Sequence, residues 1–335
     1  MTGSATADPR EGAPSKGFSK TTDPMRKIRT YQDVTHETGS ELLEQVVDQQ
    51  RRLADRLAQV RSVVAVASGK GGVGKSAITA NLAAALAARG LAVGAVDADL
   101  NGPSLARMLG VSGARLADRQ SGVSPAQSPS GVRVISMELL QEEEDAPLRW
   151  REPGMGGFIW QSTLETGVLR EFLGDVEWGK LDVLLVDVPP GTDKIGRLLE
   201  LVPDVDQMLL VTTPSETARF VVSKSVRMAR EAAVGTVALV SNMAGHTCSE
   251  CGHVSELFTG DGATRLEEES GVPVWAEIPF DPRLGAATDA GTPLVLTDPD
   301  AHSSRAIFAL ADRVEQHVEL RAEHAAEDPV EEASS

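Results

Sequence analysis

The sequence contains few cysteines, few aromatic residues and no long apolar run, and each shortage excludes a class of protein. The two cysteines, Cys248 and Cys251, are too few for a disulfide framework. Aromatic residues make up only 4%, so a buried core must consist largely of Ala, Val and Leu. No stretch of about 18 apolar residues is present, so we expect no transmembrane helix.

Positive charge is also scarce. Lys and Arg number 32 against 49 Asp and Glu, a net charge of −17. Such a charge repels phosphate backbones and anionic lipid, so neither nucleic acid nor a membrane is an expected partner. The first residues lack the apolar core of a secretory signal, and we therefore expect a cytoplasmic protein.

Composition divides the chain into four expected parts. Residues 1–37 are rich in Gly, Ser, Thr, Pro and charge and are expected to be disordered, whereas apolar residues recur at helical spacing through an amphipathic helix at 38–61. The main domain is expected at 62–322, and an acidic disordered tail at 323–335. Within the main domain, the polar insertion 110–130 is expected to be a mobile surface excursion.

Seven short apolar runs alternate with helical stretches in the main domain. The runs are almost continuously apolar, which is typical of parallel strands that are covered on both faces. They predict an α/β fold with a doubly wound, mostly parallel sheet and helices on both faces. The expected strands are 63–68, 92–97, 132–136, 181–188, 207–212, 236–241 and 274–278.

A phosphate-binding loop joins the first strand to an Ala-rich helix. Its sequence fits the pattern G-x-x-x-x-G-K-[ST], and strand, loop and helix stand in the order that the motif requires. The glycines allow backbone N–H groups to face phosphate oxygens, Lys75 reaches the β- and γ-phosphates, and Ser76 is placed to bind Mg²⁺. The nucleotide-binding residues expected here are Gly69, Lys70, Gly71, Gly72, Val73, Gly74, Lys75, Ser76 and Ala77.

A second lysine and two strand-terminal carboxylates refine this prediction. Lys70 is not needed to hold phosphate within one subunit, and it is typical of the deviant P-loop, in which this lysine reaches the nucleotide of a dimer partner. The run Asp97-Ala98-Asp99 ends the second strand, and Asp187 ends the strand before Pro189-Pro190-Gly191-Thr192. A carboxylate in that position typically acts on Mg²⁺ or its waters, and the following turn is a candidate switch.

Two further residues are candidates for the base pocket. Asn242 ends a strand, and its amide can offer both a donor and an acceptor to adenine. Pro279 closes another strand and could wall the pocket, although ordinary turn chemistry explains either residue equally well. The Asn-Lys-x-Asp pattern of guanine binders is missing at this position, which favours ATP over GTP.

The pair Cys248-Ser249-Glu250-Cys251 admits three interpretations. A thioredoxin-like redox pair is disfavoured, because the pair neither opens the domain nor precedes an evident helix. A Zn²⁺ knuckle could be completed by His246 and His253, although four ligands so close in sequence would be strained around one ion. In the third interpretation, two copies of the chain supply four thiolates to one [4Fe–4S] cluster, which agrees with the dimer implied by Lys70.

Taken together, these motifs resemble the Mrp/ApbC family of iron–sulfur carrier ATPases, within the deviant-Walker class that includes MinD, ParA and the nitrogenase iron protein. The resemblance runs from about residue 63 to about residue 296. It is carried by SGKGGVGKS (68–76), DADLNGPS (97–104), VEWG (176–179), VDVPPGT (186–192), VTTPSE (211–216), SNMAG (241–245), CSECGH (248–253) and EIPFDPRLGAATDAGTPLV (277–295).

The resemblance implies a homodimeric ATPase that binds a [4Fe–4S] cluster at its interface and passes it to apo iron–sulfur proteins, with cluster scaffold proteins as further partners. In this pattern Lys70 contacts the partner's nucleotide, Asp99 positions the attacking water or helps to hold Mg²⁺, and Asp187 acts through the water shell of the metal. Cys248 and Cys251 hold the cluster.

The chain departs from the family pattern at three places. Ala77 stands where a Thr is usual, Asn101 stands where a Tyr is usual, and a lone Asp193 replaces Gly-Asp, which shortens the second switch by one residue. These departures leave two alternatives open, a positioning ATPase of the MinD or ParA type without a cluster, and a Zn-binding nucleotide switch with little turnover.

Overall fold

The computed structural model describes residues 39–119, 122–140, 157–214, 216–248, 251, 253–257 and 262–327. All of these belong to one compact unit, Thr38–Ser335. The segment 1–37, expected to be disordered, and residues 328–335 of the expected tail lie outside the described residues.

Every apolar run that the sequence analysis singled out contains a strand. The strands are β1 (Val60–Ala67), β2 (Val93–Asp97), β3 (Ala117–Arg119), β4 (Gly122–Ser124), β5 (Ala126–Gln127), β6 (Arg133–Ile135), β7 (Leu181–Asp187), β8 (Gln207–Thr212), β9 (Thr236–Thr247), β10 (Val254–Glu256) and β11 (Val274–Phe280).

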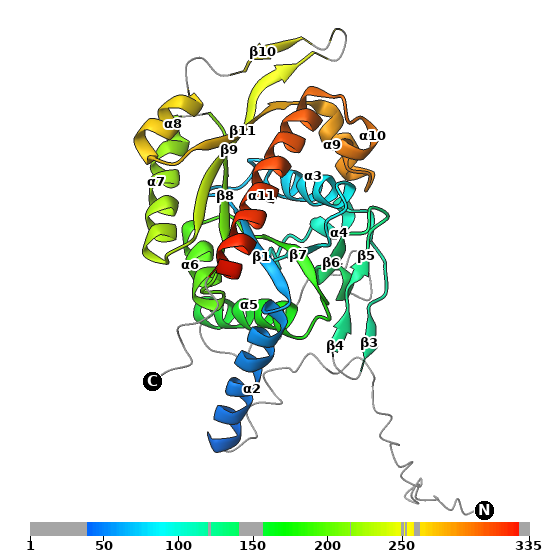
Figure 1. Cartoon of the computed structure of the whole chain (residues 1–335), viewed down its shortest axis with the longest axis vertical. Helices are drawn as coiled ribbons and strands as arrows, with labels where there is room; N and C mark the ends of the chain where they lie inside the picture. Colours follow the sequence, from blue (N-terminus) through cyan, green and yellow to red (C-terminus); the bar gives the residue numbers. More distant parts are fainter. Residues whose placement is uncertain are drawn as a thin grey trace, which may run out of the picture. The chain divides into compact units, whose positions relative to one another are not determined.

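Most strands form a nine-stranded sheet, and β3 and β4 form a separate hairpin. The central strands run parallel in the order β9-β8-β1-β7-β2-β6, and β11 pairs in parallel with β9 (Figure 1). The short strands β5 and β10 are antiparallel to β6 and β9. The order reverses at β1, because β2 and β6 lie on one side of it and β8 and β9 on the other. In such sheets ligands bind at this reversal, beyond the carboxyl ends of the strands.

Helices alternate with the strands along the chain. They are α2 (Gly39–Leu57), α3 (Lys75–Ala88), α4 (Leu105–Met108), η1 (Met137–Leu140), α5 (Gly157–Gly174), α6 (Thr192–Leu201), α7 (Glu216–Glu231), α8 (Gly262–Ser270), α9 (Pro282–Asp289), α10 (Leu294–Thr297) and α11 (His302–Glu327). The α/β prediction, with a mostly parallel sheet and helices on both faces, is confirmed.

Two hydrophobic cores lie on opposite faces of the sheet. Successive residues of β1 point to opposite faces. Val64 and Val66 belong to the core shared with α3, α4 and α9–α11, whereas Val63 and Ala65 belong to the core shared with α2, α5, α6 and α7. Both cores consist mainly of Val, Leu and Ala, as the shortage of aromatic residues predicts.

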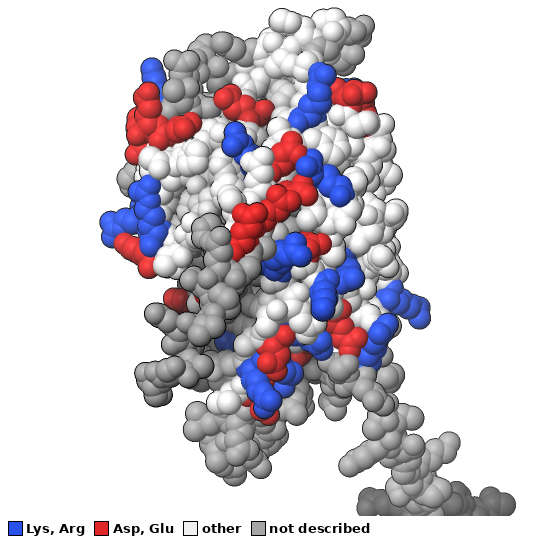
Figure 2. All heavy atoms as spheres, viewed as in Figure 1, with Lys and Arg blue, Asp and Glu red and all other residues white. Residues whose placement is uncertain are grey.

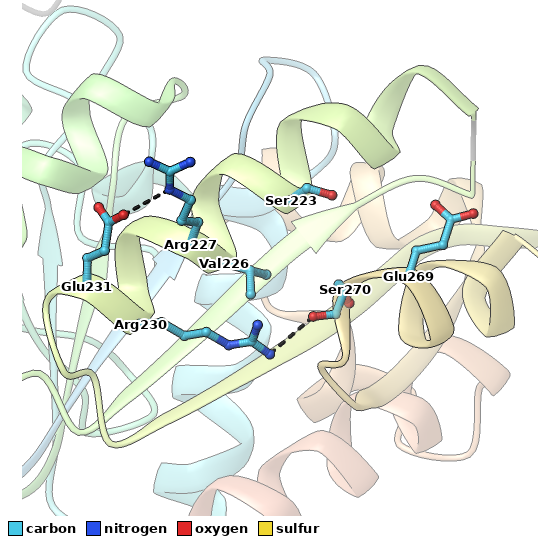
Figure 3. A pocket seen from close by; sticks show the side chains of 7 residues that line it. All are labelled: Ser223, Val226, Arg227, Arg230, Glu231, Glu269 and Ser270. Carbon is cyan, nitrogen blue, oxygen red and sulfur yellow. Dashed lines mark hydrogen bonds and ion pairs between the residues drawn. The ribbon is translucent and has the colours of Figure 1, made fainter.

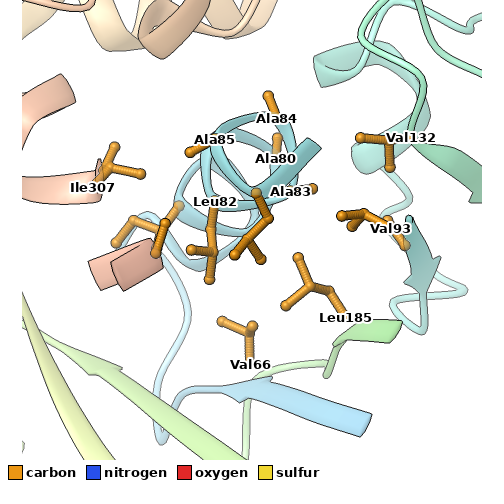
Figure 4. Packing of buried hydrophobic residues seen from close by; sticks show 14 of the residues in the cluster. Val66, Ala80, Leu82, Ala83, Ala84, Ala85, Val93, Val132, Leu185 and Ile307 are labelled. Carbon is orange, nitrogen blue, oxygen red and sulfur yellow. The ribbon is translucent and has the colours of Figure 1, made fainter. Parts of the chain in front are cut away.

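Helix α3, which follows the phosphate-binding loop, is buried nearly all round. Its residues 78–86 lie between Val66 and Leu185 of the sheet on one side and Ile307 of α11 on the other (Figure 4). Small alanine side chains allow this close approach of two helices and a sheet. The start of α3, and with it Lys75, is therefore held rigidly against the sheet.

Two expected boundaries are wrong. The helix expected at 38–61 ends at Leu57, and Val60 already pairs with Leu181 as the first residue of β1, so the main domain begins before residue 62. Val60 continues the helical spacing, but the sheet provides its backbone partners. At the other end, α11 continues to Glu327, past the expected start of the tail at 323, because Glu and Ala are good helix formers.

The prediction of a mobile excursion at 110–130 is also wrong for residues 117–119 and 122–127. These form β3, β4 and β5, and β5 joins the main sheet by pairing with β6. Val123 exchanges backbone hydrogen bonds with Asp175 and Glu177. The polar composition concealed these strands, because backbone hydrogen bonds between β3 and β4, to β6 and to residues 175–177 form them without an apolar pattern.

Helix α2 packs on α5. The backbone of Leu53 lies so close to Gly174 that a Cβ there would be 3.3 Å from it, and Arg52 forms an ion pair of 2.9 Å with Asp175. Burial, reinforced by the nearby Asp175 carboxylate, raises the pKa of Glu171 to about 7. This carboxyl group therefore makes the α2–α5 contact sensitive to pH.

We expect Glu171→Gln to stabilise the protein at pH 8 by up to about 3 kcal/mol. Between the unfolded pKa and about 7 the native state holds a proton that the unfolded chain releases, so wild-type stability is lost as the pH rises through this window. Urea unfolding of wild type and variant at pH 5 and pH 8 measures the difference. The difference in stability between variant and wild type should become much smaller at pH 5. Glu200→Gln, at an exposed site of α6, is the matched control.

On the face shown in Figure 2, Lys and Arg side chains alternate with Asp and Glu, and no continuous field of one sign is visible. Ion pairs also connect helices, since Arg89 of α3 pairs with both Asp312 and Glu315 of α11. Among the described residues, no helix has both the length and the apolarity needed to span a bilayer.

Candidate functional site

The phosphate-binding loop lies between β1 and α3, at the reversal of strand order. Gly72 and Gly74 have φ angles of 76° and 81°, and a Cβ at Gly74 would lie 2.4 Å from Nδ2 of Asn242. Glycine at position 74 is therefore required by both the backbone angle and the space. Helix α3 begins directly after Gly74 with neither a capping side chain nor an acidic residue in its first turn, which leaves its positive end suited to an anion.

Asp187 is the centre of a buried polar cluster beneath this loop. Its Oδ1 lies 2.6 Å from Lys75 Nζ, and its Oδ2 accepts a hydrogen bond of 2.6 Å from the Ser76 hydroxyl. Thr79, one turn further along α3, donates to Oδ1 at 2.8 Å. The side chains of Lys75 and Asp187 are 7% and 0% exposed, so the ion pair is shielded from water.

Strand register explains why these groups meet. Asp187 lies beside Val66 of β1 on one side and beside Asp97 of β2 on the other. Because parallel strands end at the same edge of the sheet, the carboxylate at the end of β7 comes directly under the loop that leaves β1. The spacing of Thr79 four residues after Lys75 could have revealed its position on the same helix face, but the sequence analysis missed it.

Asp97 has an organising role that the motif alone did not reveal. Its carboxylate accepts hydrogen bonds from the backbone N–H groups of Asp99, Ser104 and Leu105 and from the Ser136 hydroxyl. Burial, together with the neighbouring Asp187 carboxylate, raises the pKa of Asp97 to about 7. Asp97 thus shapes the turn that carries Asp99 and does not face outward itself.

The other predicted nucleotide residues lie around the loop. Asp99 is half-buried and accepts the N–H of Gly102, Lys70 is exposed, and Ala77 is half-buried in the first turn of α3. Asn242 is buried, and its Nδ2 donates to the carbonyl of Val73 at 2.8 Å. Pro279 is buried in β11, between Ile278 and Phe280, at the level where β11 pairs with Asn242.

The cysteine pair lies at the tip of the hairpin formed by β9 and β10. Cys248 donates its backbone N–H to the carbonyl of His253 at 2.9 Å. Cys248 is half-buried and Cys251 is exposed. The rings of His246 and Phe280 stack beside the hairpin with their centroids 6.1 Å apart. Ser249 and Glu250, between the cysteines, lie outside the described residues.

The hairpin does not assemble a zinc knuckle in this conformation. All four residues of that interpretation, His246, Cys248, Cys251 and His253, are described, yet no set of three or more His, Cys, Asp or Glu side chains in the described part of the chain is arranged to hold a metal ion. Apolar side chains are exposed on and beside this hairpin, since Val254 of β10, Leu257 directly after it and Phe280 of β11 are each 38–44% exposed.

A groove of about 420 Å³ lies away from these motifs, between α7 and α8 (Figure 3). Its charged groups are already bound within the chain. Arg227 pairs with Glu231, and Arg230 donates to the backbone carbonyls of Ser270 and Gly271 at the end of α8. The groove contains none of the predicted site residues. The hydrogen bonds of Arg230 connect α7 to the end of α8.

Solved structures confirm the class of fold. A nucleotide-binding protein from Archaeoglobus fulgidus, solved in complex with ADP, superimposes with a TM-score of 0.61 at 33% identity and covers 72% of this chain and 91% of its own. The septum site-determining protein MinD of Pyrococcus horikoshii, complexed with Mg-ADP, superimposes with a TM-score of 0.55 at 22% identity, covering 78% and 98%. The fold and the loop define a P-loop NTPase with the architecture of MinD and ParA.

Sequence comparison narrows this class. The chain matches the ParA family, described as "NUBPL iron-transfer P-loop NTPase", over residues 59–315. The iron-sulfur cluster carrier protein of Saccharolobus solfataricus is 37% identical over 79% of this chain and 86% of its own length, and that of Methanocaldococcus jannaschii is 34% identical over 83% and 92%. The chain therefore belongs to the iron-transfer P-loop NTPase family, and the resemblance stated from its motifs is confirmed.

Proposed function

We propose that this protein is a homodimeric, cytoplasmic ATPase that carries a [4Fe–4S] cluster between two cysteine hairpins and transfers it to apo-proteins. The observation that carries the proposal is the course of β9. Asn242 on this strand donates a hydrogen bond to the phosphate-binding loop, and Cys248, six residues later, directly follows the end of the strand at Thr247. One element thus connects the nucleotide site with the thiols.

The geometry of Lys75 suggests the first step of the cycle. Without nucleotide, its ammonium group is neutralised by Asp187. The β- and γ-phosphates of ATP offer a stronger set of charges, so Lys75 turns from Asp187 towards them as ATP binds. Slow turnover is expected for two reasons. Lys75 must exchange Asp187 for the phosphates before hydrolysis, and the second switch is one residue shorter than in the family pattern.

Mg²⁺ fits the donor atoms at this site. The Ser76 hydroxyl and the carboxylates of Asp187 and Asp99 supply oxygen ligands, which Mg²⁺ prefers, directly or through water. Bound there with ATP, Mg²⁺ supplies positive charge that neutralises the phosphates. Ser76 and Asp187 already contact one another at 2.6 Å and would hold the Mg²⁺ ion beside the phosphates. Asp99 would orient the attacking water.

The cluster is the cargo of this protein. Each chain supplies only two thiols, and a [4Fe–4S] cluster takes four, so two hairpins must meet on a two-fold axis. The exposed apolar residues on and beside the hairpin, Val254, Leu257 and Phe280, suit a face that a second copy covers. The same face would open towards a scaffold protein or a recipient apo-protein when the cluster is passed on.

We expect Lys70 to act on the nucleotide of the partner subunit. Neither Lys70→Ala nor Lys75→Ala subunits should hydrolyse ATP alone, yet a mixture should regain activity. In the mixed dimer, one site combines an intact Lys75 with a partner's intact Lys70. Steady-state ATPase assays of re-equilibrated mixtures measure this recovery. A mixture that stays at the level of its parents contradicts the role in trans.

A positioning ATPase of the MinD or ParA type is the less favoured alternative. Such a protein needs a basic amphipathic segment for a membrane or a basic patch for DNA. Helix α11, the last described helix, instead ends in the sequence ELRAEHAAE, in which acids outnumber basic residues.

Anaerobic reconstitution with iron and sulfide tests the proposal as a whole. The holoprotein should show the broad visible absorbance of a [4Fe–4S] cluster, hydrolyse Mg-ATP, and activate an apo-enzyme that needs such a cluster. Activation should be faster with ATP than with ADP. A protein that hydrolyses ATP but never acquires iron would favour the positioning alternative.

A further inference from the structure

Glu165 of α5 contacts two segments that follow strands of the sheet at the nucleotide edge, the turn after β2 and helix α6 after β7. Its Oε1 accepts a hydrogen bond of 2.9 Å from Asn101 Nδ2. Its Oε2 lies 2.5 Å from Lys194 Nζ and 3.3 Å from Arg197 Nη1. One carboxylate thus receives donors from two separate segments of the chain, one after β2 and one after β7.

Both segments carry residues of the proposed reaction. Asn101 stands two residues after Asp99, in the turn whose Gly102 N–H is bound by the Asp99 carboxylate. Lys194 lies in the first turn of α6, directly after the run Pro189–Thr192 that follows Asp187. The orientation of Asp99 and the course of the loop after Asp187 are therefore both connected to α5 through Glu165.

The surroundings of Glu165 favour a permanent ionic contact. Its side chain is 13% exposed. Burial alone would raise the pKa of Glu165, but the hydrogen bonds from Lys194 and Asn101 and the nearby charges hold it below its usual value. The adjacent cavity, lined by Ala98, Val188 and Pro189, has a volume of only about 30 Å³. It has room for a water molecule or two and not for a ligand.

We propose that Glu165 is a positioning residue for the ATPase reaction, which links the turn that carries Asp99 to the start of α6 so that both switch segments are held in one arrangement. This inference rests on the proposed function. It assigns a role to two of the three places where the chain departs from its family pattern, since Asn101 replaces the usual Tyr and Lys194 directly follows the shortened second switch. Asn101 and Lys194 meet at the same carboxylate.

Amide hydrogen exchange of the nucleotide-free protein tests the link without any assay of activity. Glu165→Gln keeps the size of the side chain and removes the charge. We expect exchange at least about fivefold faster in both 99–104 and 189–194, with β1 and β8 unchanged. Glu231→Gln, which removes the carboxylate of the exposed pair with Arg227, is the matched control and should change neither segment.

Kinetics test the positioning role. In Glu165→Gln, kcat should fall about tenfold while KM for Mg-ATP stays within about twofold, because misplaced groups affect the transition state more than binding. Asn101→Ala and Lys194→Met should each lower kcat, and their effects should not add, because both act through one carboxylate. Lys194→Met also serves if Glu165→Gln does not fold.

Each result decides a separate point. Unchanged exchange in either segment overturns the link, whether or not the protein hydrolyses ATP. Faster exchange in both segments with an unchanged kcat, or additive effects of Asn101→Ala and Lys194→Met, overturns the positioning role. A wild-type protein without ATPase activity overturns the proposed function and with it the positioning role, while the exchange data still decide whether Glu165 links the two segments.

Discussion

Lys75→Ala is expected to weaken ATP binding strongly and, in addition, to destabilise the nucleotide-free protein. Loss of the ammonium group facing the phosphates should weaken affinity by at least about 2 kcal/mol, the scale of a charged hydrogen bond. The same change leaves the buried Asp187 carboxylate without its counter-charge, which should cost about 3 kcal/mol of folding stability. Calorimetric titration with Mg-ATP and urea unfolding measure the two effects.

A double variant separates binding from stability. In Lys75→Met with Asp187→Asn, neither charge remains. Thr79 can still donate to the amide oxygen of the Asn, and the Ser76 hydroxyl, which donates to the other carboxylate oxygen in the wild type, can accept from the amide NH2. Stability should return towards the wild-type value while ATP binding stays weak. Lys194→Met is the control. It removes a partly buried ammonium group outside the phosphate-binding loop, and this variant should still bind ATP. Unchanged affinity in Lys75→Ala would overturn the assignment of the nucleotide site.

Cys248→Ser and Cys251→Ser should each eliminate the cluster. Wild-type protein reconstituted without oxygen is expected to hold about four iron atoms and four sulfides per dimer, and either variant nearly none, because two thiolates per dimer cannot hold a cubane. The dimer without nucleotide should weaken in parallel, since the cluster bridges the subunits. Iron and acid-labile sulfide analysis and sedimentation measure both. ATP binding should persist, because the thiols and the phosphate-binding loop are separate groups.

Histidine variants distinguish the cluster from the zinc knuckle. His246→Gln and His253→Gln should retain iron under the cluster interpretation, whereas a knuckle would need both rings as ligands. The metal content of anaerobically prepared wild type is equally decisive. One tightly held Zn²⁺ per chain, lost in the histidine variants, would contradict the proposed cargo. Ser255→Ala, on the outer strand of the same hairpin, controls for general disturbance of the hairpin.

Local sequence determined much of this protein. The alternation of apolar runs with helical stretches predicted each central strand, because strands buried on both faces must be apolar throughout. The phosphate-binding loop was readable because its glycines, lysine and serine act through backbone geometry and spacing within nine residues. The shortage of aromatic residues likewise predicted a core of Val, Leu and Ala.

Tertiary structure decided what depends on distant residues. The strands within 117–119 and 122–127 were missed because backbone pairing between β3 and β4, with β6 and with residues 175–177 forms them without an apolar pattern. The start of β1 at Val60 follows from pairing with Leu181. Only the register of β1, β2 and β7 brings Asp187 under Lys75 and beside Asp97. No local pattern marks Glu165, because its three donors come from segments that only the packing of α5 brings together. Motifs can state which groups are present, whereas the sheet and its helices decide which of them touch.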